Sequence, residues 1–171
     1  MKIYLIRHGA KEKEGFDGKL IWEGIEQIRK LAERFSNSDA KVIYSSANPR
    51  SLQTAQIIRE YSKLPLIQIN SIREIEKETF FNFEEAPEEE KLNLENLKIF
   101  LNELMNKNEN CILAMHAGIN RAIISLLLDI PLKKTIVFTQ SVANITELEY
   151  KEVYGEKRWC LNLLNDINHL K

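Results

Sequence analysis

The chain has 171 residues, 44% of them hydrophobic, and its 24 lysines and arginines nearly balance 25 aspartates and glutamates. This length and composition fit a single domain spanning residues 1–171, and the net charge of −1 excludes an overall field that would attract nucleic acid or an anionic membrane. No apolar run approaches the roughly 20 residues of a membrane span and the first residues already resemble a strand, so we expect a cytoplasmic protein.

The first predicted strand ends in side chains that suit chemistry. Tyr4, Leu5 and Ile6 have the apolar, β-branched and aromatic bias of a buried strand, and Arg7, His8 and Gly9 follow. Ligands of open α/β sheets bind beyond the carboxyl ends of parallel strands, so this tripeptide occupies a favourable place for a site. Alone, such a tripeptide is more often an ordinary loop, and its interpretation depends on the rest of the chain.

Helices and strands alternate in the first half of the chain. Hydrophobic residues at helical spacing predict a helix over 23–35, and a short strand is expected at 41–44. Asn48 and Pro49 are placed to cap and open a second helix, and a third strand is expected at 66–69. This alternation predicts parallel strands joined by right-handed crossovers, with helices on both faces of the sheet.

The segment after the third strand is less regular. We expect residues 71–86 to form a loop, and the sequence leaves open whether this loop acts as a lid. Pro87 and the glutamates after it predict the start of a helix, because carboxylates favour the positive end of the helix dipole. The apolar run at 111–115 predicts a central strand that ends at His116 before another helix.

Two edge strands complete the predicted sheet. They are expected at 141–150 and 158–163, antiparallel and joined by a turn around Gly155. The fold class is therefore α/β, a three-layer α/β/α sandwich with a mostly parallel central sheet and an antiparallel edge. Cys111 and Cys160 fall in predicted strands and form no Cys-x-x-Cys pair, which favours unreactive buried thiols over a redox pair.

The predicted strand ends share one kind of chemistry. If the strands are parallel neighbours, Arg7, His8, Arg50 and His116 converge at one edge of the sheet, next to the amide-rich starts of helices. Helix amino termini and arginines suit a phosphoryl group, whose oxygens offer several acceptors. The histidines show no zinc-binding spacing, and the sequence predicts an anion site with no metal ligands.

Histidine is the residue of this set that can perform covalent chemistry. A neutral imidazole can attack phosphorus and carry the phosphoryl group, which divides one displacement into two easier ones. The leaving alkoxide needs a proton, and Glu74 follows the third strand near the same edge. Composition alone favours the alternative that Glu74 is an ordinary surface glutamate.

The chain resembles the histidine phosphatase superfamily, also called the phosphoglycerate mutase-like family. The resemblance rests on motifs in the family's order: Leu5-Ile6-Arg7-His8-Gly9, Leu20-x-x-x-Gly24-x-x-Gln27, Ser45-x-x-x-x-Arg50-x-x-Gln53-Thr54-Ala55, Ile72-Arg73-Glu74 and His116-x-Gly118. Residues 164–170 are similar to the tail of the phosphatase branch. The match covers essentially the whole chain and implies a phosphoglycerate mutase-like fold.

The resemblance also implies a role for each matching residue. His8 would be the phosphorylated nucleophile, Glu74 the proton donor, and Arg7, Arg50 and His116 the groups that bind the phosphoryl unit. No cofactor is expected. For His169, in the tail, we favour a role in packing or hydrogen bonding.

The chain departs from the family pattern near the first motif. Lys11 and Glu14 occupy positions where family members often have threonine and asparagine. Lys11 could contact the phosphate or substrate as a point charge, although a solvated loop lysine is about as common. Ala117 replaces a frequent glycine, which should leave a backbone donor available.

The leading hypothesis is a metal-independent phosphomonoester hydrolase acting on a small phosphorylated metabolite or phosphate ester. A phosphoglycerate mutase and a protein phosphohistidine phosphatase are the alternatives, and a non-enzymatic phosphate-binding module is the alternative from another class. The short segment after Glu74 favours escape of the phosphoryl group to water over its return to substrate. The substrate and the oligomeric state, a homodimer included, stay open.

Overall fold

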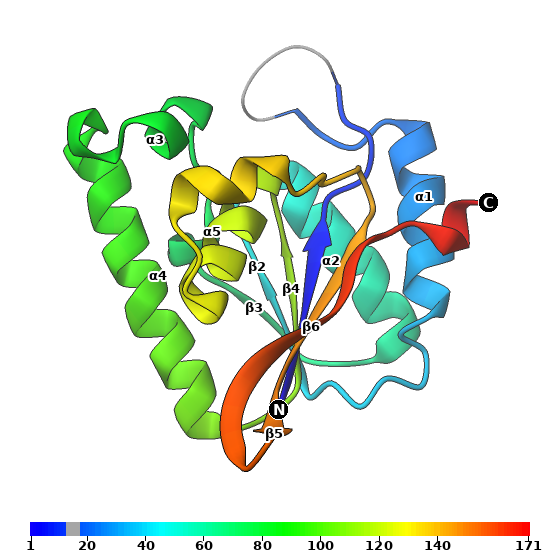
Figure 1. Ribbon diagram of the computed structural model, residues 1–171. Helices are drawn as coiled ribbons and strands as arrows, with labels where there is room; N and C mark the ends of the chain where they lie inside the picture. The colour runs from blue at the N-terminus through cyan, green and yellow to red at the C-terminus, as the bar shows by residue number, and fades with distance from the viewer. Residues whose placement is uncertain (13–17) are drawn as a thin grey trace.

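The computed structural model describes residues 1–12 and 18–171, and these residues form one six-stranded sheet with helices on both faces (Figure 1). The strands lie in the order β3-β2-β4-β1-β5-β6. Their bounds are β1 (Lys2–Arg7), β2 (Val42–Ser45), β3 (Leu66–Gln68), β4 (Cys111–Met115), β5 (Ile145–Val153) and β6 (Glu156–Asp166).

The central strands are parallel and the last two are antiparallel. β4 pairs in parallel with β1 on one side and β2 on the other, and β2 pairs in parallel with β3. β5 runs antiparallel to β1, and β6 runs antiparallel to β5. The mostly parallel sheet with an antiparallel edge is thus confirmed.

The helices form two outer layers. α1 and α2 pack together on one face, while α4 and α5 cover the other (Figure 1). Their bounds are α1 (Trp22–Glu33), α2 (Pro49–Ser62), α3 (Lys77–Phe81), α4 (Glu88–Lys107) and α5 (Ala117–Leu128). Short 3-10 turns are η1 (Asn70–Ile72), η2 (Phe83–Glu85), η3 (Leu132–Val137) and η4 (Asn168–Leu170).

Successive residues of the central strands point into different cores. Leu5 belongs to the cluster under α4 and α5, whereas Ile6 belongs to the cluster under α1 and α2. β4 is buried along its whole length, as expected for a strand covered on both faces. The predicted central position of 111–115 is therefore correct.

The segment 71–86 differs from the prediction, because η1, α3 and η2 lie within or overlap it. Acidic residues interrupt the apolar spacing there and hide these short helices from a periodicity argument. Phe80 of α3 is buried and anchors the segment to the core. Pro87 also lies one position before its helix, at the N-cap of α4.

Asn48 takes the predicted N-cap position of α2 and Pro49 the first helical position, but the Asn48 side chain makes no capping hydrogen bond. Its Oδ1 accepts instead from the Ser46 hydroxyl at 3.0 Å. The β5–β6 turn contains Tyr154 and Gly155 at φ values of 53° and 81°, the left-handed geometry that matches the twist of a two-residue hairpin. The predicted turn is confirmed, and β6 extends beyond the predicted strand at both ends.

The two cysteines lie in strands as predicted. Cys111 in β4 is buried, and burial raises the pKa of its thiol to about 12, which keeps it unreactive. Cys160 in β6 is only half-buried, so the expectation of burial holds fully for one thiol and partly for the other.

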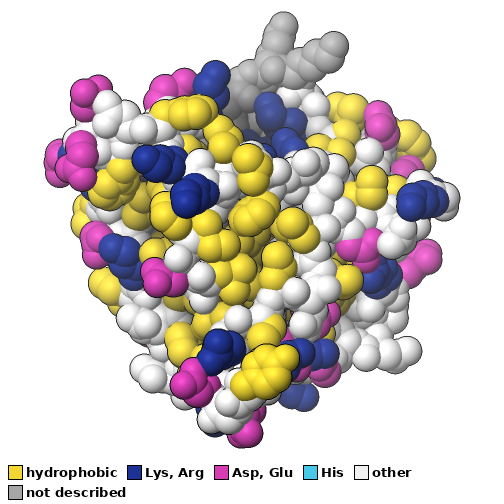
Figure 2. All heavy atoms as spheres, in the orientation of Figure 1, with side chains coloured by type: hydrophobic (Ala, Val, Ile, Leu, Met, Phe, Trp, Pro, Cys, Tyr) yellow, Lys and Arg dark blue, Asp and Glu magenta, His cyan; other side chains and the backbone are white. Residues whose placement is uncertain are grey.

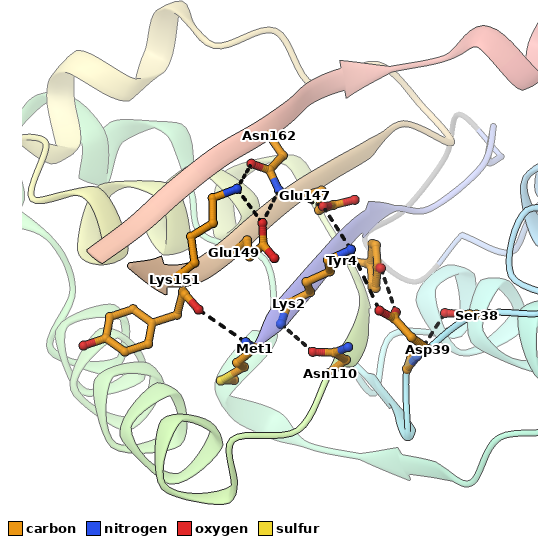
Figure 3. Close-up of polar contacts among 12 residues, drawn as sticks. Met1, Lys2, Tyr4, Ser38, Asp39, Asn110, Glu147, Glu149, Lys151 and Asn162 are labelled. Carbon is orange, nitrogen blue, oxygen red and sulfur yellow. Dashed lines mark hydrogen bonds and ion pairs between the residues drawn. The ribbon is translucent and has the colours of Figure 1, made fainter. Parts of the chain in front are cut away.

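Polar contacts fasten the amino end of β1, far along the strand from His8 (Figure 3). The backbone amide of Lys2 donates to Asn110 Oδ1 at 2.7 Å, and the Tyr4 hydroxyl donates to Asp39 Oδ1 at 2.8 Å. Burial, together with Asp39, raises the pKa of Tyr4. These contacts fix the position of β1, whose other end carries the candidate site.

Hydrophobic side chains gather on the face formed by α5, η3 and β6 (Figure 2). Val137 of η3 is 75% exposed. No helix in the described parts of the chain has the length and apolarity needed to cross a membrane.

Candidate active site

The sheet register brings the ends of three strands together. Arg7 at the end of β1 lies opposite Met115 of β4, and Ser45 at the end of β2 lies opposite Ala114. His8 and His116 are each the next residue along their strands, so the parallel pairing places them side by side. Their ring centroids are 5.4 Å apart.

Two hydrogen bonds define the ring orientation of His8. Its Nδ1 lies 2.8 Å from the carbonyl oxygen of Gly9, an acceptor, so Nδ1 carries the proton. Arg50 Nε donates to His8 Nε2 at 3.1 Å, so Nε2 presents a lone pair. The arrangement selects the neutral tautomer in which Nδ1 carries the proton and Nε2 carries the lone pair.

Burial lowers the pKa of His8 to about 3, although the hydrogen bond to Gly9 opposes this shift. The positive charges of Arg50, Arg7 and Lys11 lower it further. A neutral imidazole is therefore maintained well into the acidic range. This is the protonation state in which a histidine can attack phosphorus.

His116 is completely buried between two serine hydroxyls. Its Nε2 lies 3.0 Å from Ser46 Oγ and 3.2 Å from Ser51 Oγ. Burial lowers the pKa of His116, and the charge of Arg50 adds to this effect. His116 is thus also neutral, with its ring held by residues on both sides of the α2 amino terminus.

Arg7 and Arg50 approach the histidines from different elements. Arg50 is 3% exposed in the first turn of α2, where its guanidinium reaches His8. Arg7 Nη1 donates to the carbonyl oxygen of Gln140, whose side chain accepts from Asn120 Nδ2 at 2.9 Å. Among the described residues, Arg7 Nε is buried without a hydrogen-bond partner, which leaves part of this guanidinium for a ligand.

Motif residues around α1 position the loop after His8. A Cβ at Gly9 would lie 2.4 Å from the carbonyl oxygen of Gly24, so only glycine permits this close approach. Gln27 Oε1 accepts from the amide of Ala10 at 2.9 Å, and Gln53 Oε1 accepts from the amide of Leu20 at 2.8 Å. The glycine and glutamine motif positions therefore fix the loop after His8, and Gly9 also accepts a hydrogen bond from the His8 ring.

Glu74 lies at the amino terminus of α5. Its Oε1 accepts from the amides of Gly118 at 2.8 Å and Ile75 at 3.2 Å, so Oε2 is the oxygen that can carry a proton. Burial raises the pKa of Glu74, while these amides, the amide of Ile119 and Arg50 oppose the rise. The carboxyl group is therefore not the ordinary surface glutamate that composition favours. The Gly118 amide is engaged by Glu74 and is not available to a ligand.

Lys11 and His169 lie further from the histidine pair. Lys11 Nζ donates to the carbonyl oxygen of Glu12 at 3.0 Å, and its charge reaches His8. A phosphate contact from Lys11 stays a prediction, and Glu14 lies outside the described residues. His169 Nε2 lies 2.9 Å from the carbonyl oxygen of Ala143, as the expected packing role requires.

Several site residues escape the sequence reasoning: Ser46, Ser51, Asn120, Arg121 and Gln140. Ser46 and Ser51 flank the quoted Arg50 motif, and their spacing around the α2 start is a signal that could have found them. Asn120 and Arg121 lie one turn beyond His116 and Gly118 on a predicted helix. Gln140 gives no signal, because the contact that matters most is made by its backbone carbonyl.

The assembled site is suited to a phosphoryl anion. Two guanidiniums and two neutral imidazoles surround one point at the sheet edge, with a carboxyl group beside them. Across residues 1–12 and 18–171, no group of three or more His, Cys, Asp and Glu side chains is placed to hold a metal ion.

Comparison with known families identifies the class. Residues 3–98 match the model of the histidine phosphatase superfamily (branch 1), which is more than half of the chain. The chain therefore belongs to this superfamily, as its motifs indicate. No curated protein sequence matches the chain.

Solved structures of low sequence identity share the fold. A phosphoserine phosphatase from Entamoeba histolytica is 22% identical with a TM-score of 0.79, and the match covers 99% of each chain. An alpha-ribazole phosphatase from Shigella flexneri is 19% identical with a TM-score of 0.77, over 98% of this chain and 97% of that one. A mycobacterial glucosyl-3-phosphoglycerate phosphatase is 18% identical with a TM-score of 0.77, over 96% and 98%. These likenesses confirm the phosphoglycerate mutase-like fold.

Proposed function

We propose that the protein is a phosphomonoester hydrolase that works without a metal ion, through a phosphohistidine intermediate on His8. The observation that carries the proposal is the orientation of His8, whose Nδ1 is fixed by Gly9 and whose Nε2 lone pair faces Arg50. Family membership and the phosphatases among the structural neighbours support it.

In the first step, His8 Nε2 attacks the phosphorus of the bound ester. The new N–P bond forms as the P–O bond to the alcohol breaks, and protonated Glu74 gives its proton to the leaving oxygen. Arg50 and Arg7 stabilise the negative charge on the transferring oxygens, a role that bound magnesium or an arginine finger takes elsewhere. The proposed step therefore needs no metal ion.

In the second step, water attacks the phosphorus of phosphohistidine. The Glu74 carboxylate accepts a proton from this water, the N–P bond breaks, and inorganic phosphate leaves. His8 and Glu74 return to their starting protonation states, so the cycle is balanced.

His116 contributes to binding in this proposal. Its ring is neutral, and in the tautomer whose Nε2 accepts from the Ser51 hydroxyl its Nδ1–H can donate to a phosphoryl oxygen without adding charge.

A phosphoglycerate mutase is the second candidate, because 3-phosphoglyceric acid is bound in one of the structural neighbours, itself a phosphoserine phosphatase. The cover after Glu74 consists only of the short α3 and η2, which favours access of water to the intermediate. We therefore place hydrolysis first.

A panel of phosphorylated metabolites, assayed for released phosphate with and without a chelator, tests the proposal. We expect chelator-resistant hydrolysis that His8→Ala abolishes and that a control in the carboxyl-terminal segment, His169→Asn, retains. A coupled assay for exchange between 2- and 3-phosphoglycerate separates the candidates, and brisk exchange with little phosphate release would favour the mutase.

A further inference from the structure

A third arginine lies beside the proposed phosphoryl pocket. Arg121 is on α5, three residues after Gly118, whose amide donates to Glu74. Residues three apart share a helix face, and helical side chains lean toward the amino terminus of their helix. Arg121 is therefore directed toward the end of α5 that holds Glu74.

The segment after η3 holds Arg121 and Arg7 next to each other. Arg121 Nε donates to the carbonyl oxygen of Phe138 at 3.0 Å, and Arg7 donates to the carbonyl oxygen of Gln140. In Figure 1 this segment passes over the carboxyl ends of the central strands. Residues two apart in extended backbone are separated by about 7 Å, so the two guanidiniums are neighbours within the reach of one small ligand.

Electrostatic interactions agree with this placement. Burial lowers the pKa of both Arg7 and Arg121. The positive charge of Arg121 lowers the pKa of Arg7 further, and the negative charge of Glu74 opposes the lowering at Arg121. Both effects require Arg121 to lie within range of the site. The geometry and the charges therefore identify the same location.

The site carries more positive charge than a simple phosphate ester can neutralise. Arg7 and Arg50 match the two negative charges of a phosphoryl group, Lys11 adds a further positive charge near His8, and Glu74 is neutral when it serves as the acid. No carboxylate of the described residues forms an ion pair with Arg121. The positive charge of Arg121 is thus left for a second anionic group on the ligand.

We propose that Arg121 binds a carboxylate on the alcohol part of the substrate, so that the preferred substrates are phosphate esters of small hydroxy acids. This inference rests on the proposed hydrolase function. With Nε engaged by Phe138, Arg121 offers its Nη edge, which matches a planar carboxylate. The exposed glutamates of the cover, among them Glu76, Glu78, Glu84 and Glu85, disfavour a second, more highly charged phosphate.

The test compares two esters that differ mainly at one carbon. 3-Phosphoglycerate carries a carboxylate where glycerol 3-phosphate carries a hydroxymethyl group. We expect the wild-type protein to have a higher kcat/KM for 3-phosphoglycerate. In Arg121→Gln the ratio of the two kcat/KM values should fall about 10- to 100-fold, mainly through KM, because a charge-assisted hydrogen bond is lost.

Lys133→Gln is the matched control, because it removes an exposed positive charge from the neighbouring η3. This variant should leave the ratio unchanged. Equal losses on both esters in Arg121→Gln would overturn the inference and make Arg121 a positioning residue for Glu74. A wild-type protein without preference for the acid would overturn it as well.

A binding measurement keeps this inference separate from the hydrolase proposal. Calorimetry of 3-phosphoglycerate on His8→Ala and on the double variant His8→Ala/Arg121→Gln requires no turnover. Weaker binding to the double variant supports the carboxylate site even if hydrolysis fails, and equal binding contradicts it. Hydrolysis of both esters at equal rates would instead uphold the hydrolase and remove the carboxylate site.

Discussion

Arg50 Nε donates a hydrogen bond of 3.1 Å to His8 Nε2, the atom that attacks phosphorus in the proposed mechanism. The guanidinium thus occupies the lone pair of the nucleophile while no ester is bound. A phosphoryl group that enters the site replaces this contact, and Arg50 can then turn its donors to the phosphoryl oxygens. In the proposed mechanism, Arg50 thus both keeps the imidazole neutral and stabilises the charge that develops during transfer.

Replacement of Arg50 therefore tests this dual role. We expect Arg50→Gln to lower kcat/KM for a phosphomonoester by about 100- to 1000-fold, the effect of losing one preorganised donor. Arg50→Lys should recover little, because an ammonium cannot reproduce the planar fork. Arg59→Gln, on the exposed face of α2, is the control and should keep wild-type turnover.

The pH profile tests the assignment of base and acid. His8 is neutral above a pKa of about 3, and Glu74 must be protonated, with a pKa raised by burial. Activity should therefore rise through the His8 pKa, fall through the Glu74 pKa, and be greatest between the two. In Glu74→Gln the basic limb should disappear, and alkyl esters should lose more rate than aryl esters, whose leaving groups need no proton. Equal losses on both classes of ester would contradict the donor role.

Gly118 controls the position of the same carboxyl group. A Cβ at this position would lie 2.6 Å from Glu74 Oε1 and 2.7 Å from the carbonyl oxygen of Ile75. We expect Gly118→Ala to lower the free energy of unfolding by about 1–3 kcal/mol, because backbone as well as side chain must shift. Its kcat should fall more for alkyl than for aryl esters. Urea denaturation measures the free energy of unfolding, and assays with an alkyl and an aryl ester measure the two kcat values. Wild-type values in both experiments would show that a Cβ at position 118 is tolerated.

Stability should also depend on the buried histidines. The pKa of His8 is about 3 in the folded protein against an ordinary value of 6.5, and that of His116 is lowered as well. Between these values the unfolded chain binds more protons, so the stabilising contribution is complete above pH 6.5 and is lost as the pH falls toward 3. We measure the free energy of unfolding by urea denaturation from about pH 7 to about pH 4, a range around the ordinary histidine pKa. This free energy should fall less steeply with decreasing pH for His116→Gln than for the wild-type protein. Identical slopes would contradict neutral burial of His116.

The sequence predicts most of the fold because its signals are local. Strand 111–115 is uniformly apolar, and Asn48 and Pro49 mark the start of α2 through their own backbone preferences. The segment 71–86 could not be predicted well. Its short helices are stabilised by tertiary contacts, such as burial of Phe80, and not by periodicity.

The sequence also predicts the position of those site residues that follow predicted strands. His8, Arg50 and His116 follow predicted parallel strands, so their convergence depends only on topology. The contacts of Arg7 and Arg121 depend on backbone carbonyls between η3 and β5, and a carbonyl carries no sequence signal. The raised pKa of Glu74 likewise depends on burial by the packed start of α5.

The most direct test of the central claim is to trap the phosphorylated intermediate. A ³²P-labelled ester should be mixed with the protein, quenched within milliseconds into alkali, and the labelled peptide identified. We predict an alkali-stable, acid-labile label on the peptide that contains His8, absent in His8→Ala and present in His169→Asn. A reaction that turns over with no label on His8 at any time, or a label that persists in His8→Ala, would contradict the account.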